Sequence, residues 1–273
     1  MTGSKWASRY LQLLLGLLVW AWAMGLMLQL PAYGSSMTAW QLGQQCVVDL
    51  EAGHHQEAVV NCDGAIALDP KNFIYHLNRG LALYRQGDYS MALKAIDRAV
   101  TLQTQNYQGY YNRGLVQVAL HDFSAAIADF DQALALASYS EKLPQVLANI
   151  YDDRGLARLM SHQEATAIDD FNRALALDQN DIRALFNRGC ACHQMGHGTA
   201  ALQDLNQVLS LDPHHIRAYL KRGLLRRSLG DERGALADLH QAADCARVQG
   251  QPYLYHHILT LMNAWQQPVV ALG

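Results

Sequence analysis

The chain begins with a long apolar segment and continues with short amphipathic segments that repeat. Between Leu11 and Leu28 the only polar residue is Gln12, and no charged residue occurs. Beyond residue 38, apolar residues recur at the spacing of one helix face, and turn signals such as QGD at 86–88 interrupt them. Many alanines and leucines, with only six prolines, also favour helix. The pattern therefore predicts short paired helices after a hydrophobic N-terminal segment.

The amphipathic part repeats with a period of 34 residues. The pentapeptide YNRGL at 111–115 has four close variants, and the glycines of the five copies are separated by 34, 41, 34 and 34 residues. A nearly constant step of this size indicates a repeat architecture. Each repeat holds two helical halves, so we predict six helical hairpins over 39–249. The six windows are 39–72, 73–106, 107–140, 148–181, 182–215 and 216–249.

Three places in the 34-residue window hold small side chains. The eighth place is glycine in five windows and Cys46 in the first, the twentieth is alanine in all six, and the twenty-seventh is alanine in five. Glycine inside a helix costs about 1 kcal/mol relative to alanine, so its return at one place predicts that the two helices of a hairpin approach closely. A larger apolar residue occupies the twenty-fourth place of each window, with Cys62 in the first.

Two regions depart from the repeat. The step of 41 residues places seven extra residues near 139–145, and Pro144 suits the first turn of a helix, so we expect a lengthened helix there. After residue 249 a capping helix is expected over 250–267, because repeat arrays need one at an exposed end, and a tail at 268–273. The apolar face of that helix comprises Leu254, Ile258, Leu261, Met262 and Trp265.

The repeats resemble the tetratricopeptide repeat (TPR) family. The resemblance rests on the three small places, on the turn at Gly87–Tyr89, and on Pro70 and Pro213 after two of the second helices. It implies an all-α fold, a right-handed superhelical solenoid of six TPR hairpins with a concave groove. The recurring Asn-Arg-Gly is similar in style to TPR proteins of photosynthetic bacteria that help to build membrane complexes.

The N-terminal segment is interpreted as an export signal. Residues 1–34 form a signal peptide or a signal anchor, preceding a linker at 35–38, and the small residues at 32–34 leave cleavage open. If uncleaved, a hydrophobic helix at residues 10–30 is about long enough to span a membrane. Lys5 and Arg9 precede the apolar run, so the positive-inside rule places the TPR domain on the non-cytoplasmic side, in a periplasm or lumen.

Charged residues recur in the windows as well. The seventh place is arginine in five windows, and in four of these aspartate follows sixteen residues later. We interpret the two as structural partners within one hairpin, which add register more than stability because desolvation offsets their attraction. Arg79 has Ala95 at the partner place, so we expect it to be free. The predicted pairs are Arg113 with Asp129, Arg154 with Asp170, Arg188 with Asp204, and Arg222 with Asp238.

Composition and motifs exclude several functions. The formal charge of −3 is spread along the chain, so no nucleic-acid partner is predicted. No nucleophile elbow, P-loop, dinucleotide fingerprint or HExxH motif occurs, so we predict no enzyme activity, no cofactor and no small-molecule substrate. Cys46 and Cys62 lie on facing predicted helices, and an exported domain permits a disulfide between them. Whether it forms stays open at this point.

The family resemblance implies that a partner binds in the concave groove, at fixed places on the first helices. The early lining is apolar, the middle turns acidic at Asp152 and Asp153, and the late part is basic from Arg183 onward. Lysines of the family's carboxylate clamp are missing from the early repeats, so we expect a segment with apolar anchors and an acidic end. The predicted groove residues are Leu77, Asn78, Leu81, Tyr84, Tyr111, Asn112, Leu115, Asp152, Phe186, Asn187, Arg217, Lys221 and Arg227.

These observations predict a non-catalytic protein–protein interaction scaffold, exported or membrane-tethered, that binds a protein or peptide segment in its groove. Assembly of membrane complexes is the role that the resemblance suggests. An alternative is a self-assembling structural protein whose exposed apolar faces pair between copies. A third hypothesis is a metal-binding activity at Cys190, His193 and His197, which are ligand types for zinc or copper; the favoured interpretation assigns them to core and surface and predicts no metal.

Overall fold

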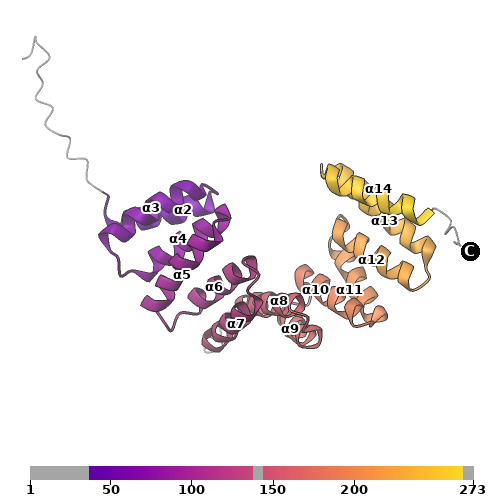
Figure 1. The fold of residues 1–273 in the computed structure, drawn as a ribbon, viewed down its shortest axis with the longest axis horizontal. Coiled ribbons are helices and arrows are strands. Elements are labelled where there is room, and N and C mark those ends of the chain that lie inside the picture. The colour runs from indigo at the N-terminus through magenta and orange to yellow at the C-terminus, as the bar shows by residue number, and fades with distance from the viewer. Residues whose placement is uncertain (1–36, 138–143, 267–273) are drawn as a thin grey trace, which may run out of the picture.

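The computed structural model describes residues 37–137 and 144–266, and these residues form thirteen α-helices and no strand. The helices follow one another in antiparallel pairs along an arc, from α2 at one end to α14 at the other (Figure 1). The predicted hydrophobic helix within 1–34 and the tail at 268–273 lie outside the described residues. Within the described ranges, no helix is long and apolar enough to cross a membrane.

Each hairpin consists of a first and a second helix. The first helices are α2 (Ala39–Glu51), α4 (Phe73–Gln86), α6 (Tyr107–Ala119), α8 (Pro144–Met160), α10 (Ile182–Gln194) and α12 (Ile216–Ser228). The second helices are α3 (His55–Leu68), α5 (Tyr89–Leu102), α7 (Phe123–Ala137), α9 (Glu164–Leu177), α11 (Gly198–Leu211) and α13 (Glu232–Val248), and α14 (Pro252–Gln266) follows them. Successive first helices contact one another, so they line the inner side of the arc. The all-α repeat architecture is therefore confirmed.

Local sequence sets where the helices begin and end. The side chain of Asn72 accepts a hydrogen bond from the backbone N–H of Ile74 at the start of α4, and Asp88 does the same for Met91 at the start of α5. Side-chain acceptors of this kind satisfy backbone donors that a helix leaves unpaired in its first turn. Gly87, with φ of 85°, ends α4 in the left-handed region that favours glycine.

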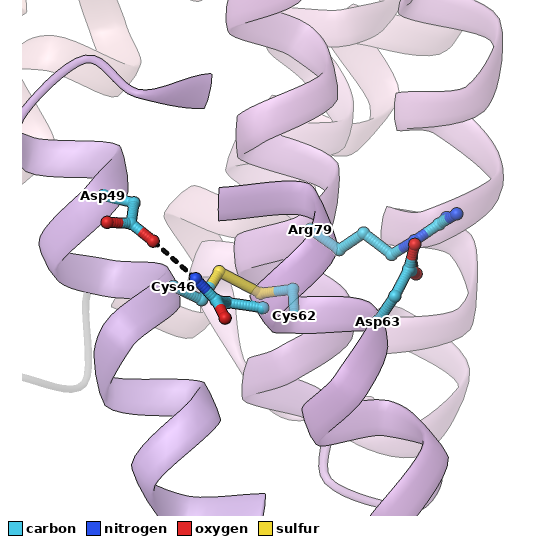
Figure 2. The surroundings of a disulfide bond; sticks show 6 residues. Cys46, Asp49, Cys62, Asp63 and Arg79 are labelled. Carbon is cyan, nitrogen blue, oxygen red and sulfur yellow. Dashed lines mark hydrogen bonds and ion pairs between the residues drawn. A yellow bond between two sulfur atoms is a disulfide. The ribbon is translucent and has the colours of Figure 1, made fainter. Parts of the chain in front are cut away.

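The small side chains allow the two helices of a hairpin to approach closely. A Cβ atom added to Gly114 would lie 2.6 Å from Cε1 of Phe130, at the twenty-fourth place of the same window. Ala126, at the twentieth place, is fully buried beside it. In the first hairpin this pair of places is occupied by Cys46 and Cys62, which form a disulfide (Figure 2). The disulfide that the sequence left open is present in the structure.

The irregular step lengthens a helix, as the sequence predicts. Helix α8 has 17 residues, whereas α6 and α10 have 13, and Pro144 is its first residue. Residues 138–143, which hold most of the insertion, lie outside the described part of the chain.

Helix α14 closes the array. It packs against α13, and Ile258 and Met262 are buried in the interface between them. Leu254, Leu261 and Trp265 join the same cluster, so the helix has the apolar face that the sequence predicts.

Candidate functional site

The four predicted pairs between arginine and aspartate all form. Arg113 donates from Nε and Nη2 to the two carboxylate oxygens of Asp129, at 2.7 Å each. The hydrogen bonds that Arg113 donates to Asp129 raise the pKa of Arg113, against the effect of burial, so the guanidinium stays charged. The same two-pronged geometry joins Arg154 to Asp170, Arg188 to Asp204, and Arg222 to Asp238. The aspartates are buried, which fits a structural role for these pairs.

The arginines also reach the preceding hairpin, which the sequence reasoning missed. Nη1 of Arg113 donates to Asp97 at 3.0 Å, and Nη1 of Arg188 donates to Asn172 at 2.8 Å. A signal was available, because the twenty-fifth place is Asp or Asn in the first five windows. These residues are Asp63, Asp97, Asp131, Asn172 and Asn206.

The expectation that Arg79 is free is wrong. Its Nε lies 2.6 Å from Oδ1 of Asp63 in the preceding hairpin, and Figure 2 shows the two side chains together. Asp63 stands sixteen residues before Arg79, in the preceding window, whereas the predicted pairs lie within one window. In the first hairpin, which has no such arginine, Gln45 and Asn61 both donate to Asp49.

A polar network crosses the inner side of the arc at α6, α8 and α10. The hydroxyl of Tyr111 donates to Asp153 at 2.7 Å, and Asn187 Nδ2 donates to Asp152 at 3.0 Å. Nη2 of Arg183 donates to Asp153 and lies 2.8 Å from Oδ2 of Asp152. Both carboxylates are buried. The prediction that they make the middle of the groove acidic is therefore wrong, because they face Arg183, Tyr111 and Asn187 instead of solvent.

Burial dominates the electrostatics of this network. Desolvation raises the pKa of Asp152 to about 6, although the hydrogen bond from Asn187 and the charge of Arg183 act in the opposite direction. Burial and the negative charge of Asp153 raise the pKa of Tyr111, so the phenol stays protonated and donates. The network can therefore hold Arg183 in place on the groove surface.

A pocket of about 410 Å³ lies next to this network, between α8, α10 and the start of α12. Phe186, Asn187 and Arg217, which the sequence predicts for the groove, line it. Leu156, Leu159 and Cys190 were missed, although they occupy the ninth and twelfth places that the family uses for its groove. The full lining is Leu156, Leu159, Ile182, Arg183, Phe186, Asn187, Cys190, His215 and Arg217.

The remaining predicted groove residues are distributed along the first helices. Leu77 is buried in the core with Ile96, so little of it faces a partner. Lys221 is exposed on α12, whereas Arg227 stacks over the Trp265 ring of the capping helix, with Cζ 4.3 Å from the ring centroid. Partly buried residues on α4 and α6 complete the set: Asn78, Leu81, Tyr84, Asn112 and Leu115.

The hypothesis of a metal site fails on geometry. In the part of the chain that the structure describes, no three His, Cys, Asp or Glu side chains are grouped so that they could hold a metal ion. Cys190 lines the groove pocket, whereas His197 precedes α11 at the hairpin turn. The structure does not bring Cys190, His193 and His197 together as ligands.

Comparison with known proteins identifies the repeats. Two family models described as tetratricopeptide repeat match the chain, one at residues 48–109 and the other at 107–139 and 182–215. No curated protein matches the chain.

Several solved structures, two of them described as TPR proteins, are similar in fold. YrrB, described as a TPR protein with an unusual peptide-binding site, is 24% identical with a TM-score of 0.55, covering 73% of this chain and 97% of its own. Pseudomonas aeruginosa PilF is 16% identical with a TM-score of 0.67, covering 82% and 97%. A TPR protein from Parabacteroides merdae is 17% identical with a TM-score of 0.62, covering 85% and 94%. Because the matched residues coincide with hairpins of the structure, this chain is a tetratricopeptide repeat protein and belongs to that family.

Proposed function

We propose that this chain is a non-catalytic interaction scaffold that binds a protein or peptide segment in its concave groove. The observation that carries the proposal is the inner surface of the arc, where successive first helices contact one another and leave an apolar pocket. A groove of this kind suits an extended or helical segment that inserts apolar side chains. The likeness of fold to YrrB, which has a peptide-binding site, supports the same function.

Export or membrane tethering is the second part of the proposal. Two observations support it: the charged and then apolar sequence of residues 1–34, and the disulfide between Cys46 and Cys62. Disulfides persist in oxidising compartments and are rare in the cytosol. The TPR domain then lies in a periplasm or lumen and serves the assembly of membrane complexes. Thiol labelling in intact cells tests the compartment, since both cysteines should react only after reduction.

Partner binding is tested with variants in the early part of the groove. Leu81→Asp on α4 and Leu115→Asp on α6 place charges among its apolar side chains, so we expect proteins that co-purify from native membranes to be lost. Gln132→Asp, on the exposed surface of the outer helix α7, is the control for an added charge. An unaltered set of co-purifying proteins with folded groove variants would contradict the proposal.

Self-assembly remains a second candidate because one hairpin exposes large apolar side chains. Trp40 on α2 is 67% exposed and Val60 on α3 is 63% exposed. Exposed apolar surface of this kind can pair between copies. Sedimentation of residues 35–273 tests it, and a monomer at micromolar concentration would exclude this candidate.

A further inference from the structure

The pocket on the inner side of α8, α10 and α12 has an apolar floor. Leu156 and Leu159 come from α8, and Ile182, Phe186 and Cys190 come from α10. The ring of His215 lies against Phe186, with centroids 5.3 Å apart, and closes one wall. The volume of about 410 Å³ falls within the range of roughly 300–1,000 Å³ that is typical of ligand sites. It can therefore take a large apolar side chain of a bound segment.

Cationic side chains surround this floor. Arg183 and Arg217 both line the pocket, and both occupy the second place of their windows, so successive inner helices present them side by side. Lys221 lies close by on α12. Burial raises the pKa of the Cys190 thiol, and the positive charge of Lys221 partly offsets that rise. All three cations are exposed to solvent.

Arg183 is held in position before any partner arrives. Its contacts to Asp152 and Asp153 use Nη2, and those carboxylates are held in turn by Asn187 and Tyr111. In the described part of the chain, Nε and Nη1 of Arg183 have no hydrogen-bond partner, and the side chain is 58% exposed. A guanidinium fixed in this way loses little conformational freedom when it binds a carboxylate.

Of the carboxylates nearby, Asp181 accepts hydrogen bonds from the backbone N–H groups of Arg183 and Ala184 in the first turn of α10. Asp152 and Asp153 are buried under Arg183, whereas Arg217 and Lys221 are exposed. The same second place is apolar at the other end of the groove, where Ile74 stands on α4. The positive charge of Arg183, Arg217 and Lys221 is therefore confined to the pocket in repeats four to six.

We propose that this pocket binds an internal protein segment in which acidic residues flank a large apolar residue. Packed helices lie roughly 8–10 Å apart, and about three residues of extended chain span that distance. Acidic side chains on both sides of the apolar residue can then reach Arg183 and Arg217 together. This inference rests on the proposed function and names the chemistry of the partner.

The test measures peptide affinity with the full chain purified in mild detergent. The probes are fluorescent, amidated peptides with a central leucine, flanked by glutamates, glutamines or lysines. We expect the glutamate peptide to bind at least about tenfold more tightly than the lysine peptide, with a difference that shrinks at high salt. Arg217→Glu should reverse the order, so that the lysine peptide binds better. Arg98→Glu, on the exposed surface of the outer helix α5, should leave the order unchanged.

The outcomes separate this inference from the proposed function. If the wild type binds all three peptides with equal affinity, the proposed function stands, and only the preference for acidic segments is overturned. A preference of the wild type for lysine would assign selectivity to Asp152 and Asp153, and it also overturns the inference. Tighter binding to anionic lipid vesicles than to any peptide, lost in Arg217→Glu, would assign the surface to a membrane instead. If Arg217→Glu ranks the peptides by affinity in the same order as the wild type, the inference is overturned as well.

Discussion

The guanidinium of Arg113 joins two hairpins, because its Nη1 lies 3.0 Å from Oδ1 of Asp97 in the preceding hairpin. Its Nε and Nη2 bind Asp129 in its own hairpin. The two carboxylates differ in environment, since Asp129 is buried and the side chain of Asp97 is 51% exposed. One side chain therefore fixes both the pairing of helices within a hairpin and the placement of one hairpin against the next.

The difference in burial predicts that Arg113→Met lowers the free energy of unfolding more than Asp97→Asn does. Arg113→Met leaves the carboxylate of Asp129 buried without a cation, so we expect the free energy of unfolding to fall by about 3–5 kcal/mol. Asp97→Asn removes an exposed ion pair, which should cost less than about 1 kcal/mol. Urea denaturation of the two variants and the wild type measures both losses. Equal losses of unfolding free energy in the two variants would show that the burial of Asp129 does not set the cost of removing Arg113.

Glycine at the eighth place leads to a second prediction. A Cβ atom on Gly114 would lie 2.6 Å from the ring of Phe130, so Gly114→Ala should lower the free energy of unfolding by about 1–3 kcal/mol through overpacking. Gly189 is the matched control, because there the nearest atom, Cβ of Asp204, is 3.3 Å away. At Gly189 the gain in helix propensity, about 1 kcal/mol, should offset most of the strain. Thermal unfolding of both variants and the wild type measures the two changes in stability. We expect a clear loss at Gly114 and little change at Gly189.

The disulfide leads to a third prediction. Cys46 and Cys62 are 16 residues apart in sequence, and closing a loop of this length stabilises a protein by about 3 kcal/mol. Reduction should therefore lower the melting temperature of the wild type by several degrees. The double variant Cys46→Gly with Cys62→Ile recreates the packing of Gly80 on Ile96, so it should fold and should not respond to reductant. A wild type with the same melting temperature after full reduction would contradict the prediction.

The regular part of the fold could be predicted from the sequence because it depends on spacing alone. Helical periodicity predicts the hairpins, and a recurring separation of sixteen residues predicts the pairing of Arg113 with Asp129, which the structure confirms. Both residues of such a pair lie in one window, where the alignment fixes their relative places. Burial of Ile258 and Met262 in the capping helix followed from the same periodicity.

Contacts between windows could not be obtained in this way. The pairing of Arg79 with Asp63 depends on how one hairpin stacks on the next, which the spacing within a window does not fix. The burial of Asp152 has the same origin, because its cover comes from Asn187 and Arg183 of the following hairpin. For the same reason, the sequence predicts only some of the residues that line the groove pocket. Its apolar floor combines side chains from two consecutive first helices, as Leu156 and Phe186 show.

The buried carboxylate of Asp152 leads to the fourth prediction, which concerns pH. Burial raises its pKa in the folded chain to about 6, from an ordinary value of 3.8. The protonated form therefore favours the folded state, and its contribution is complete below about pH 4 and is lost as the pH rises through 6. Asp152→Asn cannot ionise, so its stability relative to the wild type should rise between pH 4.5 and 7.5. We expect a relative gain of about 2 kcal/mol, since one pKa unit corresponds to about 1.4 kcal/mol.

The control for Asp152→Asn is Asp169→Asn, which removes an exposed carboxylate of α9. Urea denaturation of both variants and the wild type at the two pH values gives the relative stabilities. Burial also raises the pKa of Asp153, and the negative charge of Asp153 adds to the rise in the pKa of Asp152. If Asp152→Asn keeps a constant stability difference from the wild type at both pH values, then Arg183 and Asn187 compensate the buried charge fully. In that case desolvation is not the dominant effect on the ionisation of Asp152.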